Sequence, residues 1–263
     1  MDVNMDSCRA IAIQYGLPLQ FVIKEFHIFD VLAQITKYIH QKDIHLLFKG
    51  GTALSKVYLG KAQRFSEDID FDLDEDMLAV KQFSKELSEN IEGYDVLSSR
   101  KVRQTVQFYC DYENQLGGKD HVRIDIASKR VFTSSLPQLG TATSEFVKSS
   151  VSGFYVYNIE DLISRKIHAL CTRTEGKDVY DVYNGISLCK NMEKPLQQML
   201  KSEGKKETPK EFLLKTIDAI KKTDHKKLRN LTNPFIPLGY RPKDWLGIKN
   251  DLILKLEKVI LQL

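Results

Sequence analysis

The sequence predicts an α+β protein in which a small mixed, mostly antiparallel sheet with flanking helices precedes a helical C-terminal half. Short apolar or alternating runs beside glycine turns, the pattern of strands, occur mainly before residue 130. After residue 158, apolar residues recur at helical spacing almost to the end. A polar stretch rich in Ser and Thr, residues 133–152, separates the two patterns. We therefore expect two domains, residues 1–150 and residues 151–263.

The first half contains the elements of the predicted sheet. Helical spacing of apolar residues predicts a core helix over residues 18–40. A short apolar run, residues 45–48, then enters Gly50-Gly51-Thr52 and a further helical pattern, which predicts strand, glycine turn and helix. The remaining elements expected here are a strand over 68–73, a helix over 77–91, and two strands, 105–112 and 122–127, joined by a turn at Gly117-Gly118.

The second half is expected to be helical after one edge strand at residues 154–157. Asn158 is placed to cap the next helix, with Asp161 three residues on, an arrangement that resembles a capping box. Helical spacing then predicts helices over residues 159–173, 178–190, 193–203, 208–222 and 244–262.

Composition excludes several classes of protein. A chain of 263 residues with 42% hydrophobic positions can bury a full core, which argues against intrinsic disorder. No apolar run approaches the roughly 20 residues of a membrane-spanning helix, and a signal-peptide pattern is missing at the start. We expect a soluble, cytoplasmic protein without a membrane partner. The four cysteines and six histidines lack ligand spacing, which argues against a disulfide framework or structural zinc.

Charge is distributed unevenly along the chain. Residues 190–263 hold 17 Lys and Arg against 9 Asp and Glu, an excess of +8, whereas residues 1–189 carry a net charge of −4. A basic group in the second half would hold an RNA backbone, with ordinary solubilising charge as the alternative. Its members are Lys221, Lys222, Lys226, Lys227 and Arg229.

An acidic run, residues 67–76, holds seven acids in ten positions. The alternation places Asp68, Asp70, Asp72 and Asp74 on one side of a strand if the strand continues that far. Such crowding of like charge is unfavourable without cations, and a solvated acidic edge is the alternative interpretation. Because Asp68 lies 16 positions after Thr52, we expect a strand with alternate carboxylates to face the glycine turn.

The glycine turn and the acidic strand together suit phosphoryl or nucleotidyl transfer. Backbone N–H groups of a glycine turn that opens a helix bind a triphosphate. Gly50 and Gly51 permit its close approach, and the Thr52 hydroxyl adds a donor. Asp68 and Asp70 would hold Mg²⁺, or Mn²⁺ in its place, on one face of the strand. Two such ions would orient the triphosphate, assist deprotonation of an attacking hydroxyl and stabilise the leaving pyrophosphate.

Asp125 is the candidate for a third metal carboxylate. It lies between Ile124 and Ile126 in an otherwise apolar strand, so its side chain must point at a cavity or a partner. A pairing with Arg123 or Arg103 on an open sheet face is the alternative interpretation.

The segment FKGGTALSKVYLGKAQRFSEDIDF, residues 48–71, resembles the signature of the nucleotidyltransferase AbiEii toxin family, within the DNA polymerase β-like nucleotidyltransferase superfamily. The glycine turn and the D-x-D strand are shared by the superfamily, while R-F-S-E-D-I-D-F is narrower. The later segments EDLISRKIHAL and KDVYDVYN are similar to the family's C-terminal motifs. The resemblance implies a nucleotidyltransferase-like first domain and a helical second domain that contributes to the active-site cleft.

The resemblance also places the family's functional residues on positions of this chain. They are Gly50, Gly51 and Thr52 on the triphosphate, Asp68 and Asp70 on metal, Lys166 on phosphate, and Asp178 or Asp181 in the active cleft. Lys177 stands where the family has Arg, and lysine cannot make the bidentate planar contact of arginine.

The helical positions of the second half agree with these roles. Lys166 and Arg173 are seven residues apart and share a helix face, so we expect both cations to meet substrate. Asp178 and Asp181 would lie in the active cleft, where they would bind substrate, hold Lys166 in place or position the nucleophile. The general base is then either Asp125 or one of these two acids. An exposed basic stripe, and acids that merely favour the helix dipole, are the alternatives.

The resemblance implies a toxin-like nucleotidyltransferase that transfers NMP from an NTP to an acceptor hydroxyl and releases pyrophosphate. It makes the 3′ end of tRNA the expected acceptor, inhibition of growth and translation the expected outcome, and a cognate antitoxin protein the expected partner. Two alternatives stay open: an enzyme that modifies a protein or a small molecule such as an aminoglycoside, and a non-catalytic nucleotide- or RNA-binding module.

Overall fold

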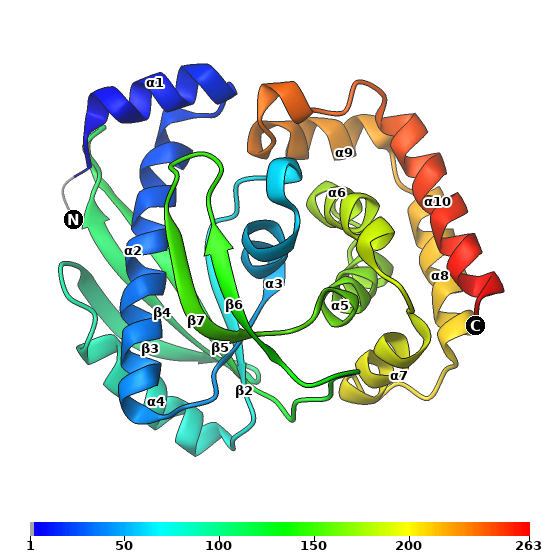
Figure 1. Cartoon of the computed structure of the whole chain (residues 1–263), viewed down its shortest axis with the longest axis horizontal. Coiled ribbons are helices and arrows are strands. Elements are labelled where there is room, and N and C mark those ends of the chain that lie inside the picture. Colours follow the sequence, from blue (N-terminus) through cyan, green and yellow to red (C-terminus); the bar gives the residue numbers. More distant parts are fainter. Residues whose placement is uncertain (1–2) are drawn as a thin grey trace. The chain divides into compact units, whose positions relative to one another are not determined.

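The computed structural model describes residues 3–263, with residues 97 and 98 described in their backbone only (Figure 1). The chain divides into two compact units. Unit 1 holds the residues up to Val131 together with Gln138–Val156, and unit 2 holds Phe132–Pro137 and Tyr157–Leu263. Within the described residues, no helix combines the length and the apolar character that crossing a membrane requires.

Unit 1 is built on one sheet, whose seven described strands run in the order β3-β4-β5-β2-β1-β7-β6. Two neighbouring pairs, β2 with β5 and β1 with β7, are parallel, and the other four are antiparallel. The predicted α+β class, with a mixed and mostly antiparallel sheet, is confirmed. The strands are β1 (Leu47–Lys49), β2 (Asp68–Leu73), β3 (Asp95–Val102), β4 (Thr105–Glu113), β5 (Lys119–Ser128), β6 (Gln138–Thr143) and β7 (Ser150–Val156).

Helix α2 (Leu19–Lys42) covers the apolar face of this sheet (Figure 1). Its His27 ring stacks on Tyr112 of β4 with centroids 3.6 Å apart, and its Lys24 donates to Asp120 of β5. Side chains alternate between the two faces of a sheet along each strand. Asp125 is five positions after Asp120 on β5, and Asp70 is its register partner on β2, so both side chains point away from α2. The other helices of unit 1 are α1 (Met5–Tyr15), α3 (Gly50–Ala53) and α4 (Met77–Glu89).

The stretch before residue 157 differs from the prediction. We expected a polar connection and one edge strand, whereas the chain forms two strands, and β7 lies inside the sheet between β1 and β6. Phe154 is fully buried and meets the ring of Phe48 with centroids 5.2 Å apart, which explains the interior position. The edge strand is β6, whose Leu139 is exposed and whose composition is too polar to be recognised as a strand.

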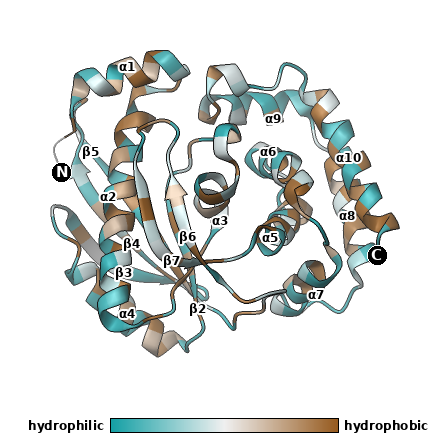
Figure 2. Cartoon of the chain, viewed as in Figure 1, coloured by the Kyte–Doolittle hydropathy of each residue, from teal (hydrophilic) through white to brown (hydrophobic). Residues whose placement is uncertain are grey.

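Unit 2 is helical. Asn158 caps its first helix by accepting from the N–H of Asp161, as expected, but the Asp161 carboxylate accepts from the backbone N–H of Ser134, so the pair is not a capping box. Helix α9 was not predicted, because its eight residues are mostly hydrophilic (Figure 2). The helices are α5 (Ile159–Thr172), α6 (Gly176–Gly185), α7 (Glu193–Ser202), α8 (Pro209–Lys221), α9 (His225–Thr232) and α10 (Trp245–Leu261).

Candidate active site

The sheet of unit 1 carries a row of polar side chains across four neighbouring strands. Strand β2 pairs in parallel with β5, which sets Asp70 directly beside Asp125. On the other side of Asp70 stands Lys49 of β1, and on the other side of Asp125 stands Gln107 of β4. Neighbouring strands lie about 4.8 Å apart, so these four side chains leave the same face as near neighbours.

Asp68 belongs to the same face, because it precedes Asp70 by two residues on β2. Its register partner on β5 is Arg123, and the Arg123 Nη2 lies 2.5 Å from Asp68 Oδ2. The same guanidinium places its Nε 3.6 Å from Asp125 Oδ1. The pairing of Asp125 with Arg123, which was the alternative interpretation of Asp125, is therefore present, and Arg123 lies between two of the predicted metal ligands.

This acidic face, as we call it, has more acids than cations. Lys49 forms an ion pair with Asp72, the next acid along β2, which is almost fully buried. Four carboxylates, those of Asp68, Asp70, Asp72 and Asp125, share this face with the cations of Lys49, Arg123 and Arg100. Carboxylates crowded in this way favour the binding of an external cation.

Asp125 has an unsatisfied oxygen. The Gln107 amide donates to its Oδ2 at 3.2 Å, but among the described residues none donates a hydrogen bond to its buried Oδ1. Burial raises the pKa of the Asp125 carboxyl, and Arg123 opposes that shift without cancelling it. A buried carboxylate oxygen without a donor is a ligand position that a hard cation would satisfy.

The glycine turn lies against this face. Gly50 has φ +80°, a conformation that L side chains rarely adopt, and a Cβ built on it would lie 2.2 Å from Asp70 Oδ2. Glycine is required there on both counts, because any side chain would displace the Asp70 carboxylate. Thr52 is buried, and its hydroxyl donates to the backbone carbonyl of Asp68, which ties the start of α3 to β2.

A buried ion pair holds the helix that follows the turn. After Ala53 the helix widens into one π-helical turn, Leu54–Tyr58, a local irregularity found at many functional sites. Its Lys56 forms a fully buried ion pair with Glu25 of α2, and Ser144 donates to the same Glu25 oxygen at 2.6 Å. Burial lowers the pKa of Lys56, while Glu25 opposes that shift. The turn is therefore anchored to both α2 and β2.

The acidic face suits a divalent cation, although its carboxylate oxygens do not converge on one point. In the part of the chain that the structure describes, no three His, Cys, Asp or Glu side chains already form a metal-binding group. The donor set nevertheless consists of carboxylate oxygens, which hard divalent cations prefer, and it includes one orphaned buried oxygen. Asp68, Asp70 and Asp125 would hold such a cation, which would polarise a phosphoryl oxygen.

Unit 2 has its own charged cluster, which we call the Lys166 cluster. The Lys166 Nζ lies 2.9 Å from Asp178 Oδ1 and 2.9 Å from Asp181 Oδ2, and both carboxylates are fully buried. Arg173, at the end of α5, adds a bidentate contact to Asp178 through Nε at 2.7 Å and Nη2 at 3.1 Å. Burial opposes ionisation of Asp178, but Lys166 and Arg173 outweigh it and hold the pKa of Asp178 below its usual value.

This geometry decides between two interpretations of Lys166. Its side chain is nearly buried between α5 and the first turns of α6, so it is not part of an exposed basic stripe. Asp178 and Asp181 hold the Lys166 ammonium in place, which is one of the roles predicted for them. Arg173 is about half exposed and keeps access to solvent.

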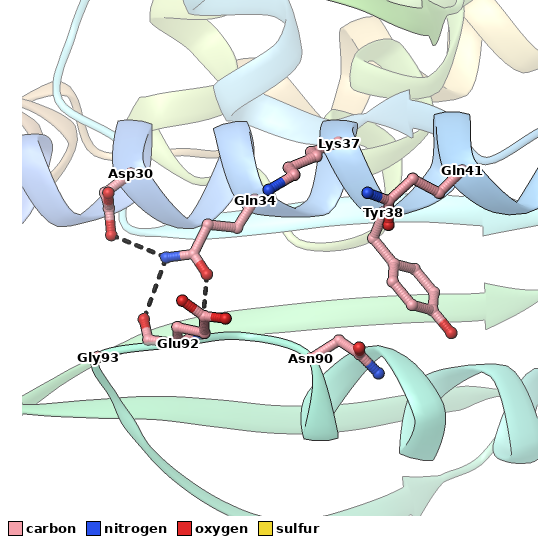
Figure 3. A pocket seen from close by; sticks show the side chains of 8 residues that line it. All are labelled: Asp30, Gln34, Lys37, Tyr38, Gln41, Asn90, Glu92 and Gly93. Carbon is pink, nitrogen blue, oxygen red and sulfur yellow. Dashed lines mark hydrogen bonds between the residues drawn. The ribbon is translucent and has the colours of Figure 1, made fainter.

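A separate polar hollow in unit 1, with a volume of about 660 Å³, contains none of the predicted site residues (Figure 3). It lies between α2 and the loop after α4. Gln34 crosses it, donating to Asp30 at 3.1 Å and to the carbonyl of Glu92 at 3.1 Å, and accepting from the N–H of Glu92 at 2.8 Å. These bonds fix the loop after α4 to α2, which is a structural role. No motif in the sequence marks it.

A family model described as the nucleotidyl transferase AbiEii toxin of a type IV toxin–antitoxin system matches residues 35–257. The chain belongs to this family, as the motifs around the glycine turn and the acidic strand predicted. It is a nucleotidyltransferase of the toxin class, for which an NTP is the substrate and an antitoxin is the partner. Enzymes of this chemistry generally use divalent metal ions.

Two solved structures share the fold. MenT4, a nucleotidyltransferase toxin from Mycobacterium tuberculosis, is 16% identical with a TM-score of 0.62, and the match covers 100% of this chain and 91% of that one. JHP933 from Helicobacter pylori is 17% identical with a TM-score of 0.57, and the match covers 94% of each chain. At these identities the likeness shows the fold alone. Among curated proteins, no sequence matches this chain.

Proposed function

We propose that this nucleotidyltransferase transfers NMP from an NTP to the 3′ end of a tRNA, with Mg²⁺ or Mn²⁺ as the metal, and thereby inhibits translation. The observation that supports the chemistry most strongly is the row formed by Asp70 and Asp125 beside the turn at Gly50. It sets oxygen ligands for a metal next to a helix start suited to phosphate.

In this proposal each residue of the acidic face has a distinct role. Asp68, Asp70 and Asp125 are the metal ligands. The backbone N–H groups of Gly50 and Gly51 bind the triphosphate, because no side chain obstructs the approach. Thr52 positions the turn, because its single hydroxyl hydrogen is donated to the Asp68 carbonyl.

The Lys166 cluster supplies the positive charge of unit 2. We assign Lys166 and Arg173 to phosphate groups of the substrates, Asp178 to holding both cations, and Asp181 to positioning Lys166. Asp125, which lies directly beside Asp70 on the neighbouring strand, is one candidate for the general base. Asp181 is the other candidate for the base.

The acceptor assignment rests on charge. Residues 190–263 carry the excess of +8, and polyanionic RNA is the acceptor that such an excess attracts. A cognate antitoxin would control the activity. Modification of a protein or of a small molecule is the alternative that the experiment below separates.

The test is incubation of the protein with each α-labelled NTP, a divalent metal, tRNA, total RNA and cell-lysate protein. We expect one NTP to label the tRNA fraction, and an Asp70→Asn variant in parallel to label nothing. Label on protein or on a small molecule would replace tRNA with the alternative acceptor. Absence of label from every fraction, with folded protein and each metal, would contradict the transfer chemistry.

A further inference from the structure

A second pocket, which none of the proposed metal ligands lines, lies within unit 2 at the start of α6. Its volume is about 520 Å³. The walls are residues 173–177, Thr223 and one side of α9. Three lining side chains are cations, Arg173, Lys177 and Lys227, and one is an acid, Glu175. The lining is therefore positively charged.

The start of α6 adds polar backbone to this pocket. The side chain of the N-cap residue, Glu175, makes no capping hydrogen bond with any described residue. The N–H groups of Asp178 and Val179 reach back to the Glu175 carbonyl, at 3.0 and 3.1 Å. Those of Gly176 and Lys177, the first two helical residues, have no acceptor within the helix, as helix geometry requires. Such a helix start favours an anion.

Thr232 gives an independent indication that the pocket is incomplete. It is 1% exposed, it lines the pocket from the end of α9, and its Oγ1 lacks a hydrogen-bond partner among the described residues. A Cβ at Gly176 would lie 2.0 Å from that oxygen and 2.6 Å from the Leu228 carbonyl. Glycine at the start of α6 therefore lets α9 approach closely, with the unpartnered Thr232 hydroxyl at the wall of the pocket.

The cations that line the pocket are positioned by neighbouring side chains. Arg173 contacts the buried Asp178 at 2.7 Å and Glu175 at 3.8 Å. The Lys177 ammonium lies 3.5 Å from the centre of the Phe235 ring, a cation–π contact. Lys227 lines the pocket from α9, a largely hydrophilic helix (Figure 2).

We infer that this pocket binds a phosphate ester group of a nucleotide. The first N–H groups of α6, Lys177, Lys227 and the Thr232 hydroxyl would hold the phosphate oxygens, and Leu228 and Leu231 give the sugar or base an apolar wall. The phosphate could belong to an RNA chain or to a free mononucleotide. The existence of the site is independent of the proposed transfer to tRNA, whereas its assignment to acceptor RNA would rest on that proposal.

The test measures binding without catalysis. One arm titrates a short labelled RNA that ends in a 3′-deoxynucleotide, in EDTA, at several salt concentrations. The other arm titrates AMP and inorganic phosphate by calorimetry under the same conditions. The variants are the double substitution Lys177→Gln with Lys227→Gln, and Thr232→Val. The matched control is Lys258→Gln, an exposed lysine of α10 that does not line the pocket.

We expect the double variant to bind at least about tenfold more weakly in one arm or both, with the Lys258→Gln protein unchanged. Loss in the RNA arm, with a salt slope lowered by about 0.7 for each lost contact, identifies a phosphodiester. Loss with AMP identifies a phosphate monoester. Equal affinities for the double variant and the control in both arms would overturn the inference.

Thr232→Val separates a binding role from a structural one. Removal of an unpaired buried hydroxyl should leave the thermal midpoint unchanged or raise it, while the affinity for the phosphate ligand falls. A lower midpoint with unchanged affinity would contradict the role assigned to Thr232. If the pocket variants lose binding while no NMP transfer is found, the proposed function fails and the pocket assignment stands.

Discussion

The acidic face of unit 1 and the Lys166 cluster of unit 2 differ in how their charges are balanced. In the Lys166 cluster, two fully buried carboxylates meet two cations at 2.7 to 3.1 Å. On the acidic face, four carboxylates share one sheet surface with Lys49, Arg123 and Arg100, and the Asp68 and Asp125 side chains keep 34% and 15% of their surface exposed. The first arrangement is buried and internally paired, whereas the second is open to an external cation.

This difference separates two uses of aspartate. A carboxylate surrounded by its own cations positions those cations and contributes to stability. Carboxylates that repel one another without enough cations destabilise the free protein, and a ligand relieves that repulsion. The following experiments test the distinction.

Neutralising an acid of the acidic face should abolish activity while leaving the fold intact. Asp70→Asn removes a proposed metal oxygen and lowers like-charge repulsion, so we expect NMP transfer to fall by at least about 10³-fold and stability to hold or rise. Asp68→Asn should act in the same direction. Turnover and urea unfolding are measured on each variant, with Glu75→Gln, an exposed acid of the same run, as the control. Near wild-type turnover in Mg²⁺ would rule out the metal assignment.

Removing the cation of the Lys166 cluster should instead destabilise the protein. Lys166→Met leaves two buried carboxylates with Arg173 alone, and breaking such a buried pair typically costs about 3 to 5 kcal/mol in free energy of unfolding. Adding Asp178→Asn and Asp181→Asn should restore much of that stability but not the activity. Urea unfolding and steady-state kinetics measure the two effects. A rise in KM alone would make Lys166 a binding residue. Unchanged stability would contradict the description of the Lys166 cluster as a buried, internally paired set of charges.

The cluster should also give the protein a pH-dependent stability of defined sign. The pKa of Asp178 is lower in the folded state than in the unfolded chain, where it is about 4. Its contribution to stability is therefore present above about pH 4 and is lost as pH falls through the folded-state value. Unfolding free energies at pH 7 and below pH 4, without metal, should show a steeper loss for the wild type than for Asp178→Asn. Parallel curves would contradict the assignment.

The smallest effect is expected from basic residues outside both clusters. Neutralising Lys221, Lys222, Lys226 and Lys227 together should weaken RNA binding and flatten its salt dependence, by about 0.7 to 0.9 in the log-log slope for each lost phosphate contact. NTP binding at the Gly50 turn and the acidic face should not change, since both are formed within unit 1, whereas any loss of mononucleotide binding would come from Lys227 in the unit 2 pocket. RNA affinity is measured at several salt concentrations, and an unaltered slope would argue against RNA as the acceptor.

Local patterns predicted much of the fold. The strand over 68–73 was placed at its observed bounds, because strict alternation of acids and apolar residues is a strong signal. Helices α1 and α9 and strands β3 and β6 were missed; α9 is short and hydrophilic, and β6 is polar. Their existence depends on tertiary contacts that override weak local preference.

The site was predictable only in part, for a similar reason. The identities of Asp70 and Asp125 followed from their patterns, but their adjacency depends on the parallel pairing of β2 with β5, which joins residues 55 positions apart. The place of Arg123 between Asp68 and Asp125 depends on the same register. The burial of Lys166 between Asp178 and Asp181 depends on how α5 packs on α6, which helical periodicity alone cannot give.

The position of β7 inside the sheet has a consequence for biosynthesis. Strand β1 is complete when the ribosome has made residue 49, but its parallel neighbour β7 begins at residue 150. One edge of β1 thus stays unpaired through about a hundred further residues, whereas β2 waits only for β5, which begins at residue 119, and pairings so distant in sequence form slowly. A nascent chain stalled before residue 150 would expose β1 to aggregation or to a chaperone. The protein acquires its glycine turn in a finished sheet only late in translation.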